Sequence, residues 1–289
     1  MSDLRNEKNI IDSWDYKDKV YVSIICPTFN QEEYIRSALD GFLTQLCDYK
    51  FEIVVHDDCS TDQTTNILNN YKERYPNIIK LILQDENQHS QGRKIIPIAL
   101  EHCEGEYIAF CDGDDYWFDR RKLQKQILAL EKNNKYTLSY SKAKAISPNG
   151  KVYSIFGSGL ISNLNYIKNG IPTLTVLIRR SVCVSFFEKF KSELNSWKMS
   201  DYPLWLYAKD FGQFHYIGEV TANYRVFDTS VSRPSDPIKV LNYRMSAFNI
   251  SRFFIKSSCQ NIVNKCYLIL LLNLYAAVWN IKYKLSKVK

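Results

Sequence analysis

The sequence lacks the short motifs that define several common protein classes. Neither G-x-x-x-x-G-K-[ST] nor G-x-G-x-x-G occurs, which excludes the commonest nucleotide-binding loops. None of the eight cysteines forms a C-x-x-C pair, which argues against a zinc site or a redox centre, and several lie in apolar runs typical of buried free thiols. The first 19 residues are polar and hold no apolar signal segment. We therefore expect a cytoplasmic protein with reduced thiols.

The remaining composition is that of a globular protein. Of its 289 residues, 45% are hydrophobic and 24% are charged, so disorder and collagen-like repeats are excluded and a large core is expected. The aromatic content of 14% suits flat sugar or base surfaces, and a bulky core would explain it equally well. The net charge of +7 is too small to indicate a nucleic-acid partner, and we expect none; it fits phosphate-bearing substrates or an anionic membrane surface.

Short apolar runs alternate with helical patterns along the first half of the chain. Strands are predicted at 20–26, 51–56, 78–83 and 107–111, and helices at 32–45, 61–75, 94–103 and 120–133. This alternation predicts βαβ units in an α/β, doubly wound and mostly parallel sheet. Ligands of such sheets bind beyond the carboxyl ends of the strands, so the loops at 27–33, 57–62 and 112–117 should share one rim.

The second half of the chain is less regular. Strands are predicted at 137–146, 151–156, 174–179, 214–217 and 220–226, and helices at 181–191, 202–209, 239–256 and 261–282. The run 267–279 is apolar on nearly every side, but its 13 residues fall short of the roughly 20 that span a bilayer. Such a helix is usually buried in a core or an oligomer contact, while its flanking lysines leave a membrane-surface contact open.

A cluster of carboxylates follows the strand predicted at 107–111. Asp112, Asp114 and Asp115 stand so close together that mutual repulsion should raise their pKa values, which a divalent cation would relieve. Carboxylate oxygens suit Mg²⁺ or Mn²⁺, which are commonly held by one or two carboxylates and by substrate phosphates. A solvated acidic turn is the alternative for any isolated D-x-D motif. The position at the carboxyl end of a strand favours a function.

Two loops on the predicted rim have both a structural and a functional interpretation. Ser60 to Asp62 would cap the next helix, whereas Asp57 and Asp58 precede that cap and offer a carboxylate to a nucleobase N–H. The loop 27–30 has the composition of a plain βα turn.

Two clusters farther along the chain also allow both a structural and a functional interpretation. The loop 88–94, with adjacent cations, is either solvated or holds a diphosphate. Asp201 opens the helix predicted at 202–209, either as an N-cap with Pro203 in the first turn or as a general base.

Together these clusters resemble the inverting family 2 glycosyltransferases of GT-A fold, of the bacterial non-processive type. The resemblance runs from residue 20 to residue 232 and rests on the order and spacing of VSIICPTFNQEEYI, VVHDDCSTDQT, EGEYIAFCDGDDYW and SDYPLWLYAKDFGQFHYIGEVTANYRV. It implies a nucleotide-sugar-binding part at 20–118 and an acceptor-binding part at 119–232. A tail at 1–19 would precede this GT-A domain, and a helical extension at 233–289 would follow it.

The resemblance also implies roles for individual residues. Those assigned to the nucleotide sugar are Pro27, Thr28, Phe29, Asn30, Asp57, Asp58, Arg93, Asp112 and Gly113. Asp58 would accept the N3–H of the base, and Arg93 would approach the base or the phosphates. An N3–H of uracil favours a UDP-sugar, although thymine and guanine offer similar groups.

The metal and the chemistry are assigned in the same way. Asp114 and Asp112 would bind Mg²⁺ or Mn²⁺, and Asp115 and Trp117 would lie near the sugar or the acceptor. Asp201 would be the catalytic base of a single displacement that inverts the anomeric configuration.

The implied activity is that of a hexosyltransferase in cell-surface polysaccharide or glycolipid synthesis. The acceptor would be a glycan or a lipid-linked sugar, and the helix at 261–282 would allow peripheral contact with the inner membrane face or a homo-oligomer. The motif Q-x-x-R-W is absent after Asp201, as is a set of spanning helices, so transfer of a single sugar is favoured over processive synthesis. Phe227 stands where many relatives carry His.

Two other functions stay open on the sequence alone. A metal-dependent phosphoryl- or nucleotidyl-transfer enzyme would use Asp112 and Asp114, but would leave Asp201 without a role. A non-catalytic module that binds a nucleotide sugar or a glycan would have no need of a base at Asp201 either.

Overall fold

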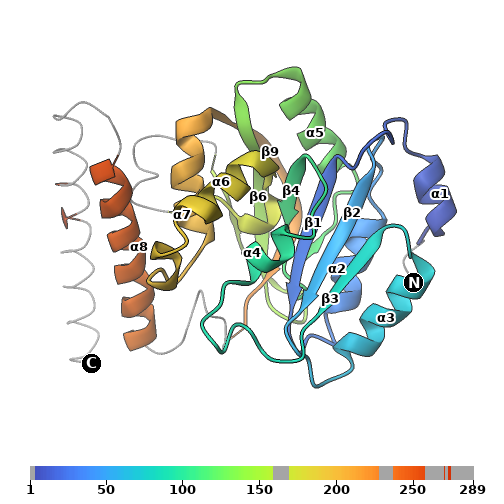
Figure 1. Ribbon diagram of the computed structural model, residues 1–289, viewed down its shortest axis with the longest axis horizontal. Coiled ribbons are helices and arrows are strands. Elements are labelled where there is room, and N and C mark those ends of the chain that lie inside the picture. The colour runs from blue at the N-terminus through green and yellow to red at the C-terminus, as the bar shows by residue number, and fades with distance from the viewer. Residues whose placement is uncertain (1–3, 159–168, 228–236, 258–269, 271–272, 275–289) are drawn as a thin grey trace.

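The computed structural model describes residues 4–158, 169–227 and 237–257, with residues 270, 273 and 274 (Figure 1). The strands are β1 (Val22–Thr28), β2 (Phe51–Asp57), β3 (Ile79–Leu83), β4 (Tyr107–Phe110), β5 (Tyr116–Trp117), β6 (Tyr136–Ile146), β7 (Val152–Phe156), β8 (Leu177–Arg179) and β9 (Gln213–Arg225). The α-helices are α1 (Glu7–Asp12), α2 (Ile35–Leu43), α3 (Thr64–Arg74), α4 (Ile95–Leu100), α5 (Lys122–Lys132), α6 (Arg180–Lys189), α7 (Asp201–Ala208) and α8 (Pro237–Ser257). Short 3₁₀ turns are η2 (Thr173–Thr175), η3 (Glu193–Asn195) and η4 (Lys209–Phe211).

The first half of the chain forms the parallel part of a single sheet. The sheet order is β3-β2-β1-β4-β8-β6-β9-β5, with β7 paired to β6, and the pairs among β1, β2, β3 and β4 are parallel. Ile24 of β1 lies between Ile53 and Ala109, and all three are fully buried because α2 and α3 cover one face of the sheet and α4 covers the other. Burial on both faces explains the continuous apolar runs in the sequence. The predicted α/β fold is confirmed.

The second half adds antiparallel strands. β8 is antiparallel to β4 and β6, and β5 is antiparallel to β9, while β6 and β9 are parallel. The sheet is thus parallel where the βαβ pattern is regular and mixed beyond it, since the periodicity of a strand does not show the direction of its partner. The strands predicted at 214–217 and 220–226 form the single strand β9, whose pairing with β6 is irregular around residues 217–220.

The N-terminal residues pack against the sheet. Ile10 of α1 is fully buried, and the buried Trp14 ring lies 5.4 Å from the Phe51 ring in an edge-to-face contact. Tyr16 pairs with Tyr49 by a parallel bridge and stacks on it at 4.5 Å. Ile10 lies within α1 and Trp14 just beyond its end, so this short N-terminal segment supplies both core contacts. The described part of the tail is therefore docked.

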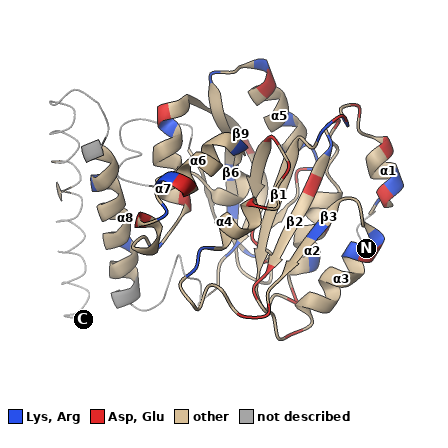
Figure 2. Ribbon diagram, viewed as in Figure 1, with Lys and Arg blue, Asp and Glu red and all other residues tan. Residues whose placement is uncertain are grey.

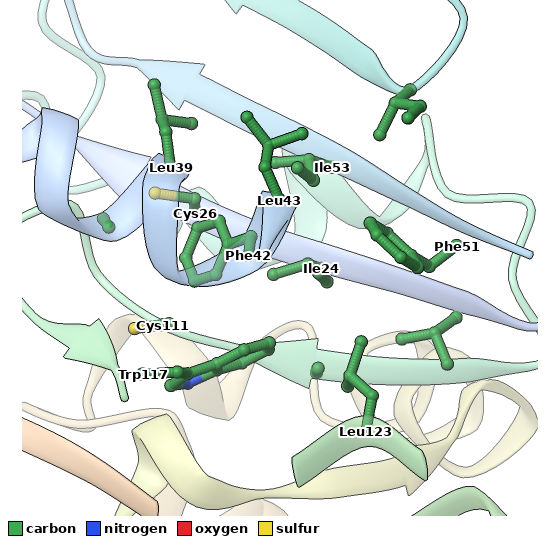
Figure 3. Packing of buried hydrophobic residues seen from close by; sticks show 14 of the residues in the cluster. Ile24, Cys26, Leu39, Phe42, Leu43, Phe51, Ile53, Cys111, Trp117 and Leu123 are labelled. Carbon is green, nitrogen blue, oxygen red and sulfur yellow. The ribbon is translucent and has the colours of Figure 1, made fainter. Parts of the chain in front are cut away.

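Two hydrophobic clusters lie on opposite faces of the sheet. Ile24 belongs to one and Ile25 to the other, as expected for neighbours on a strand. Figure 3 shows the first cluster, in which the rings of Phe42 and Trp117 meet edge-to-face at 4.8 Å beside Cys111. The six cysteines within the described residues are free, as predicted for buried thiols.

The helix α8 packs on α7, at the end of the molecule opposite α1 and α3 (Figure 1). The helix predicted at 261–282 lies outside the described residues except at three positions, of which Leu270 and Leu274 are exposed. Within the residues that the structure describes, none of the helices combines the length and hydropathy that a bilayer crossing requires.

The close approach of α2 to β5 yields a prediction at Gly41. A Cβ at this position would lie 2.6 Å from the carbonyl oxygen of Trp117, which is backbone and cannot rotate away. Alanine normally favours a helix over glycine by about 1 kcal/mol. Here we expect Gly41→Ala to lower the free energy of unfolding by about 1–3 kcal/mol in urea titrations, because the helix must move off the strand.

The exposed Arg36 on the same helix offers a control. Arg36→Ala should change the free energy of unfolding by less than about 0.5 kcal/mol. Stabilisation by Gly41→Ala would contradict the contact between α2 and β5.

Candidate active site

Three loops at the carboxyl ends of β1, β2 and β4 meet along one edge of the sheet. The backbone N–H of Asp58 donates to the carbonyl of Thr28 at 3.0 Å, and that of Gly113 donates to the carbonyl of Pro27 at 2.9 Å. A Cβ on Gly113 would lie 2.4 Å from Oε1 of Gln31 and 2.8 Å from Oγ1 of Thr28, so a larger residue would displace these side chains. Acidic residues gather in the loops below β1 and β2 in Figure 2. The loops that the sequence placed on one rim are therefore neighbours.

The carboxylate of Asp57 holds the loop after β2. Its Oδ1 accepts hydrogen bonds from the N–H and the hydroxyl of Ser60, at 3.2 and 2.5 Å, and its Oδ2 accepts one from the hydroxyl of Thr65 at 2.6 Å. Asn30 joins this loop to the one after β1, because its Oδ1 accepts the N–H of Thr61 at 2.8 Å. Asp57 and Asn30 thus shape the loops on either side of Asp58.

Asp58 connects this edge to the loop 84–94. Its buried carboxylate accepts the backbone N–H groups of Gln88 and His89, at 2.8 and 3.0 Å. Arg93 reaches the same place indirectly, since its Nη1 donates to Oε1 of Gln88 at 2.6 Å. A carboxylate has about four acceptor positions, so two backbone donors leave Asp58 able to accept another N–H. Phe29, with 44% of its surface exposed, follows the strand that carries Pro27 and Thr28.

The acidic cluster after β4 is compact. One carboxylate oxygen from each of Asp112, Asp114 and Asp115 lies within 4.8 Å of the others. Arg225 closes the cluster from β9: its backbone N–H donates to Asp115 Oδ1 at 2.7 Å, and its Nη1 donates to the carbonyl of Asp114 at 2.5 Å. The guanidinium also lies 5.0 Å from the centre of the Tyr34 ring. The cluster is therefore held by a cation from a distant strand.

The three carboxylates share one electrostatic environment. Asp112 reaches solvent, yet many protein atoms lie close around it. This partial burial is the largest cause of its raised pKa, and the negative charges of Asp114 and Asp201 raise it further. Burial raises the pKa of Asp114, while the charge of Arg225 acts in the opposite direction. The pKa of Asp115 lies well above its usual range. Burial is the main cause, and the negative charges of Asp114 and Asp112 add to it. Three hard oxygen donors with excess negative charge fit Mg²⁺ or Mn²⁺.

Asp201 is the first residue of α7 and faces this cluster closely enough to influence Asp112. Its Oδ1 accepts the N–H of Tyr202 at 2.7 Å. Its Oδ2 accepts the hydroxyl of Thr173 at 2.8 Å and the amide of Asn169 at 3.2 Å. Ser200, not Asp201, occupies the N-cap position, and the Asp201 carboxylate bonds the backbone N–H of the next residue, Tyr202. The side chain is held toward η2 by these two donors.

The family model described as glycosyl transferase family 2 matches residues 23–174, which is more than half of the chain. This chain belongs to that family. The predicted resemblance is thereby confirmed.

Two relatives of this family 2 chain show how far the likeness extends. The uncharacterized protein Rv1520 of Mycobacterium tuberculosis is 39% identical over 166 residues, which cover 55% of this chain and 47% of that protein. This chain thus spans about half the length of that relative. The Escherichia coli protein named UDP-Glc:alpha-D-GlcNAc-diphosphoundecaprenol beta-1,3-glucosyltransferase WfgD is 30% identical over 218 residues, covering 74% of this chain and 81% of WfgD.

Two solved structures share the fold. Staphylococcus aureus TarS 1–349 in complex with UDP-GlcNAc superposes with a TM-score of 0.64 at 21% identity, covering 89% of this chain and 72% of that one. The mannosyltransferase PcManGT from Pyrobaculum calidifontis, in complex with GDP-Man and Mn²⁺, superposes with a TM-score of 0.60 at 17% identity, covering 94% of this chain and 77% of that one. At these identities the likeness establishes the fold.

One predicted site residue of this family 2 chain occupies an unexpected place. The Trp117 side chain is buried in the core, and its Nε1 donates to the carbonyl of Leu174 at 2.7 Å, so it supports the acidic loop from the core side. The same turn, η2, carries Thr173, which holds Asp201. This turn therefore joins the supports of the acidic loop and of Asp201.

Sequence reasoning missed three residues of the site. Arg225 stood within a quoted motif, two residues before the position where many relatives carry His, and that motif was its only signal. Thr173 and Asn169 lie 28 and 32 residues before Asp201 and carry no local pattern. Only the fold brings them to the carboxylate.

A buried lysine lies behind the acidic loop. Lys122 is fully buried, with Nζ 3.9 Å from the centre of the Trp117 ring and 2.8 Å from Oε1 of Gln126, to which it donates. Burial lowers the pKa of Lys122 to about 7. Below pH 7 the folded and unfolded chains both carry this proton, and the folded chain bears the full cost of the buried charge. Between pH 7 and the ordinary value of 10.5, only the unfolded chain keeps the proton, so this group makes stability rise with pH.

We therefore expect Lys122→Met to increase the free energy of unfolding at pH 6 by about 2 kcal/mol, because methionine fills the space without a buried charge. The gain should shrink toward pH 10, as measured by urea unfolding across that range. Lys125→Met is the control on the same helix, because Lys125 pairs with Asp119 and Glu219 and its loss should bring no gain. A gain from Lys122→Met that is equal at pH 6 and pH 10 would show that the folded chain keeps the proton on this lysine across the range and that burial does not lower its pKa.

Proposed function

We propose that this protein transfers a single sugar from a UDP-sugar to an acceptor hydroxyl, with inversion, in the synthesis of a cell-surface polysaccharide or glycolipid. The observation that carries the proposal is the meeting of Asp112, Asp114 and Asp115 with Asp201 at one rim of a family 2 chain. Relatives support the substrate class: WfgD is named for a UDP-glucose donor and a diphosphoundecaprenol-linked acceptor, and TarS was solved with UDP-GlcNAc.

The nucleotide would bind along the loops after β1 and β2. The remaining acceptor capacity of Asp58 suits the N3–H of uracil, and the exposed Phe29 ring offers a flat surface beside it. Arg93, held by Gln88, supplies a positive charge toward the phosphates. Asn30 and Asp57 would act by shaping these loops, as their hydrogen bonds indicate.

The diphosphate would lie over the acidic cluster. Asp114 and Asp112 would hold Mg²⁺ or Mn²⁺, in line with the Mn²⁺ in the PcManGT complex. When bound, a divalent cation supplies positive charge that stabilises the diphosphate leaving group. Arg225 adds a fixed cation next to Asp114 and Asp115, which keeps the loop folded despite its own repulsion.

Asp201 would act as the general base. It would take the proton from the acceptor hydroxyl while that oxygen attacks the anomeric carbon, and the bond from the anomeric carbon to the diphosphate oxygen would break on the opposite face. Thr173 and Asn169 fix the carboxylate, so that donor and acceptor are aligned without further ordering of the base. A displacement of this kind inverts the anomeric configuration.

Phe227 gives this site a different local chemistry from relatives with His. Its ring meets the Tyr34 ring edge-to-face at 5.2 Å, so the position contributes an aromatic contact next to Arg225. We propose that Arg225 supplies, through its charge, the electrostatic support that a histidine could give there.

The experiment that tests the function measures release of nucleoside diphosphate. Purified protein is incubated with a panel of nucleotide sugars and with Mn²⁺, Mg²⁺ or a chelator. Asp201→Asn should lower kcat by about 10²–10⁴-fold, because it removes the base, while nucleotide affinity measured by calorimetry stays within about twofold. Binding of nucleotide sugars by the wild type without turnover would support the non-catalytic module instead. Full turnover by Asp201→Asn would overturn the assignment of the base.

The contact of Thr173 with Asp201 yields a separate prediction. Thr173→Val keeps the shape of the side chain but removes the donor, so Asp201 loses a hydrogen bond of 2.8 Å and its fixed orientation. We expect kcat to fall by roughly tenfold, with KM for the donor nearly unchanged, since the nucleotide loops are not touched. Thr173→Ser, which keeps the hydroxyl, should recover most of the rate. Equal losses in both variants would show that the residue acts through packing alone.

A further inference from the structure

A long stretch of the chain carries positive charge and no negative charge. Residues 133–187 contain no Asp or Glu, although the chain has 31 of them in total. The cationic residues of this stretch are Lys135, Lys142, Lys144, Lys151, Lys168, Arg179 and Arg180. A segment of one sign of charge and of this length fits an anionic partner.

The hairpin of β6 and β7 presents apolar side chains from this stretch. Val152, Tyr153 and Ile155 expose 52%, 57% and 55% of their surface, although they belong to the strand β7. β7 pairs with β6 as a branch off the main order of the sheet. Exposed apolar side chains gathered on one short strand commonly mark a contact surface.

The strand register places lysines beside these apolar groups. Lys144 lies opposite Ile155, whereas the buried Ala143 lies opposite Phe156. Side chains alternate along a strand, so Lys142 and Lys144 lie on the same side as Ile155. The exposed Tyr153 lies at the β-bulge of β7, two residues before Ile155. Phe118, 42% exposed, joins them, because Lys144 Nζ lies 4.9 Å from the centre of its ring. We call these five residues the hairpin face.

The hairpin face adjoins the rim of the site. Phe118 follows the acidic loop by three residues, and β5, which precedes it, pairs with β9 just before Arg225. Lys125 pairs with two carboxylates of neighbouring elements, Asp119 and Glu219, at 2.9 and 2.5 Å, so this group keeps one negative charge beside the two lysines of the face. The face therefore keeps its positive character next to the site.

We propose that the hairpin face docks on an anionic lipid bilayer. Exposed aromatic and aliphatic groups beside an excess of lysines are the combination that inserts at a bilayer surface and is held there by anionic headgroups. A soluble polyanion would be attracted by the lysines but would gain nothing from Tyr153 and Ile155. Binding of the hairpin face to a bilayer does not require the sugar transfer. It rests on the proposed function at one point: a bound bilayer would bring a lipid-linked acceptor to the rim of the site.

The test is co-sedimentation of the full chain with vesicles. Vesicles of phosphatidylcholine in which about a third of the lipids are phosphatidylglycerol are compared with phosphatidylcholine alone, at low and high salt. We expect binding to the anionic vesicles that weakens with salt. Tyr153→Ser combined with Ile155→Ser should weaken it roughly tenfold or more, because the inserted apolar surface is lost. Phe211→Ser is the control, since Phe211 is 50% exposed on η4 and lies outside the face.

Several results would overturn the proposal. These are no sedimentation of the wild type, equal binding to both kinds of vesicle, unchanged binding of the double variant, and an equal loss in the Phe211→Ser control. Inorganic polyphosphate that binds the double variant as tightly as the wild-type chain binds vesicles would point to a soluble polyanion instead. If the double variant fails to fold, as judged by circular dichroism, Ile155→Thr repeats the test with a residue that favours strands.

Diphosphate release with a water-soluble acceptor separates the two proposals. The hairpin variants should keep the wild-type rate in that assay, since they leave the site residues in place. A wild type that binds anionic vesicles through the hairpin face but releases no diphosphate would overturn the proposed function and leave the docking surface standing.

Discussion

Repulsion among four carboxylates at one edge of the sheet is the constraint on which the rest of the structure depends. Asp112, Asp114 and Asp115 lie within a few ångströms of one another, and the charge of Asp201 adds to the field on Asp112. Enclosed like charges raise each other's pKa values and oppose folding of the loop that carries them. Arg225 offsets part of this charge through its bonds to the loop. A bound cation and diphosphate would complete the balance under the proposed function.

The surroundings of the cluster keep these groups in place without substrate. Trp117 anchors the acidic loop to the carbonyl of Leu174, and the adjacent Thr173 holds Asp201, so one 3₁₀ turn supports both the acidic loop and the carboxylate opposite it. Gly41 lets α2 approach the strand on which Trp117 lies. Groups held by packing and by second partners need little reordering when a ligand arrives, which favours catalysis over loose binding.

The sequence was most informative where local chemistry and chain order coincide. The apolar runs of β1, β2 and β4 predicted a sheet edge, and Asp58 and Asp112 follow those strands directly. It was less informative about the direction of β8 and about the side chain of Trp117, which the resemblance placed near the sugar or the acceptor and which is buried in the core. An aromatic residue next to a motif has the same pattern whether it faces a ligand or the interior.

The sequence by itself determined the βαβ order of the first half, the family and the acidic residues at strand ends, because these depend on neighbours along the chain. Only the tertiary structure decided that Thr173 and Asn169 hold Asp201, that Arg225 closes the acidic cluster, and that Lys144 and Ile155 share an outer face. These contacts join residues that are far apart in the chain. Their geometry depends on how strands and helices pack, which no local pattern of residues encodes.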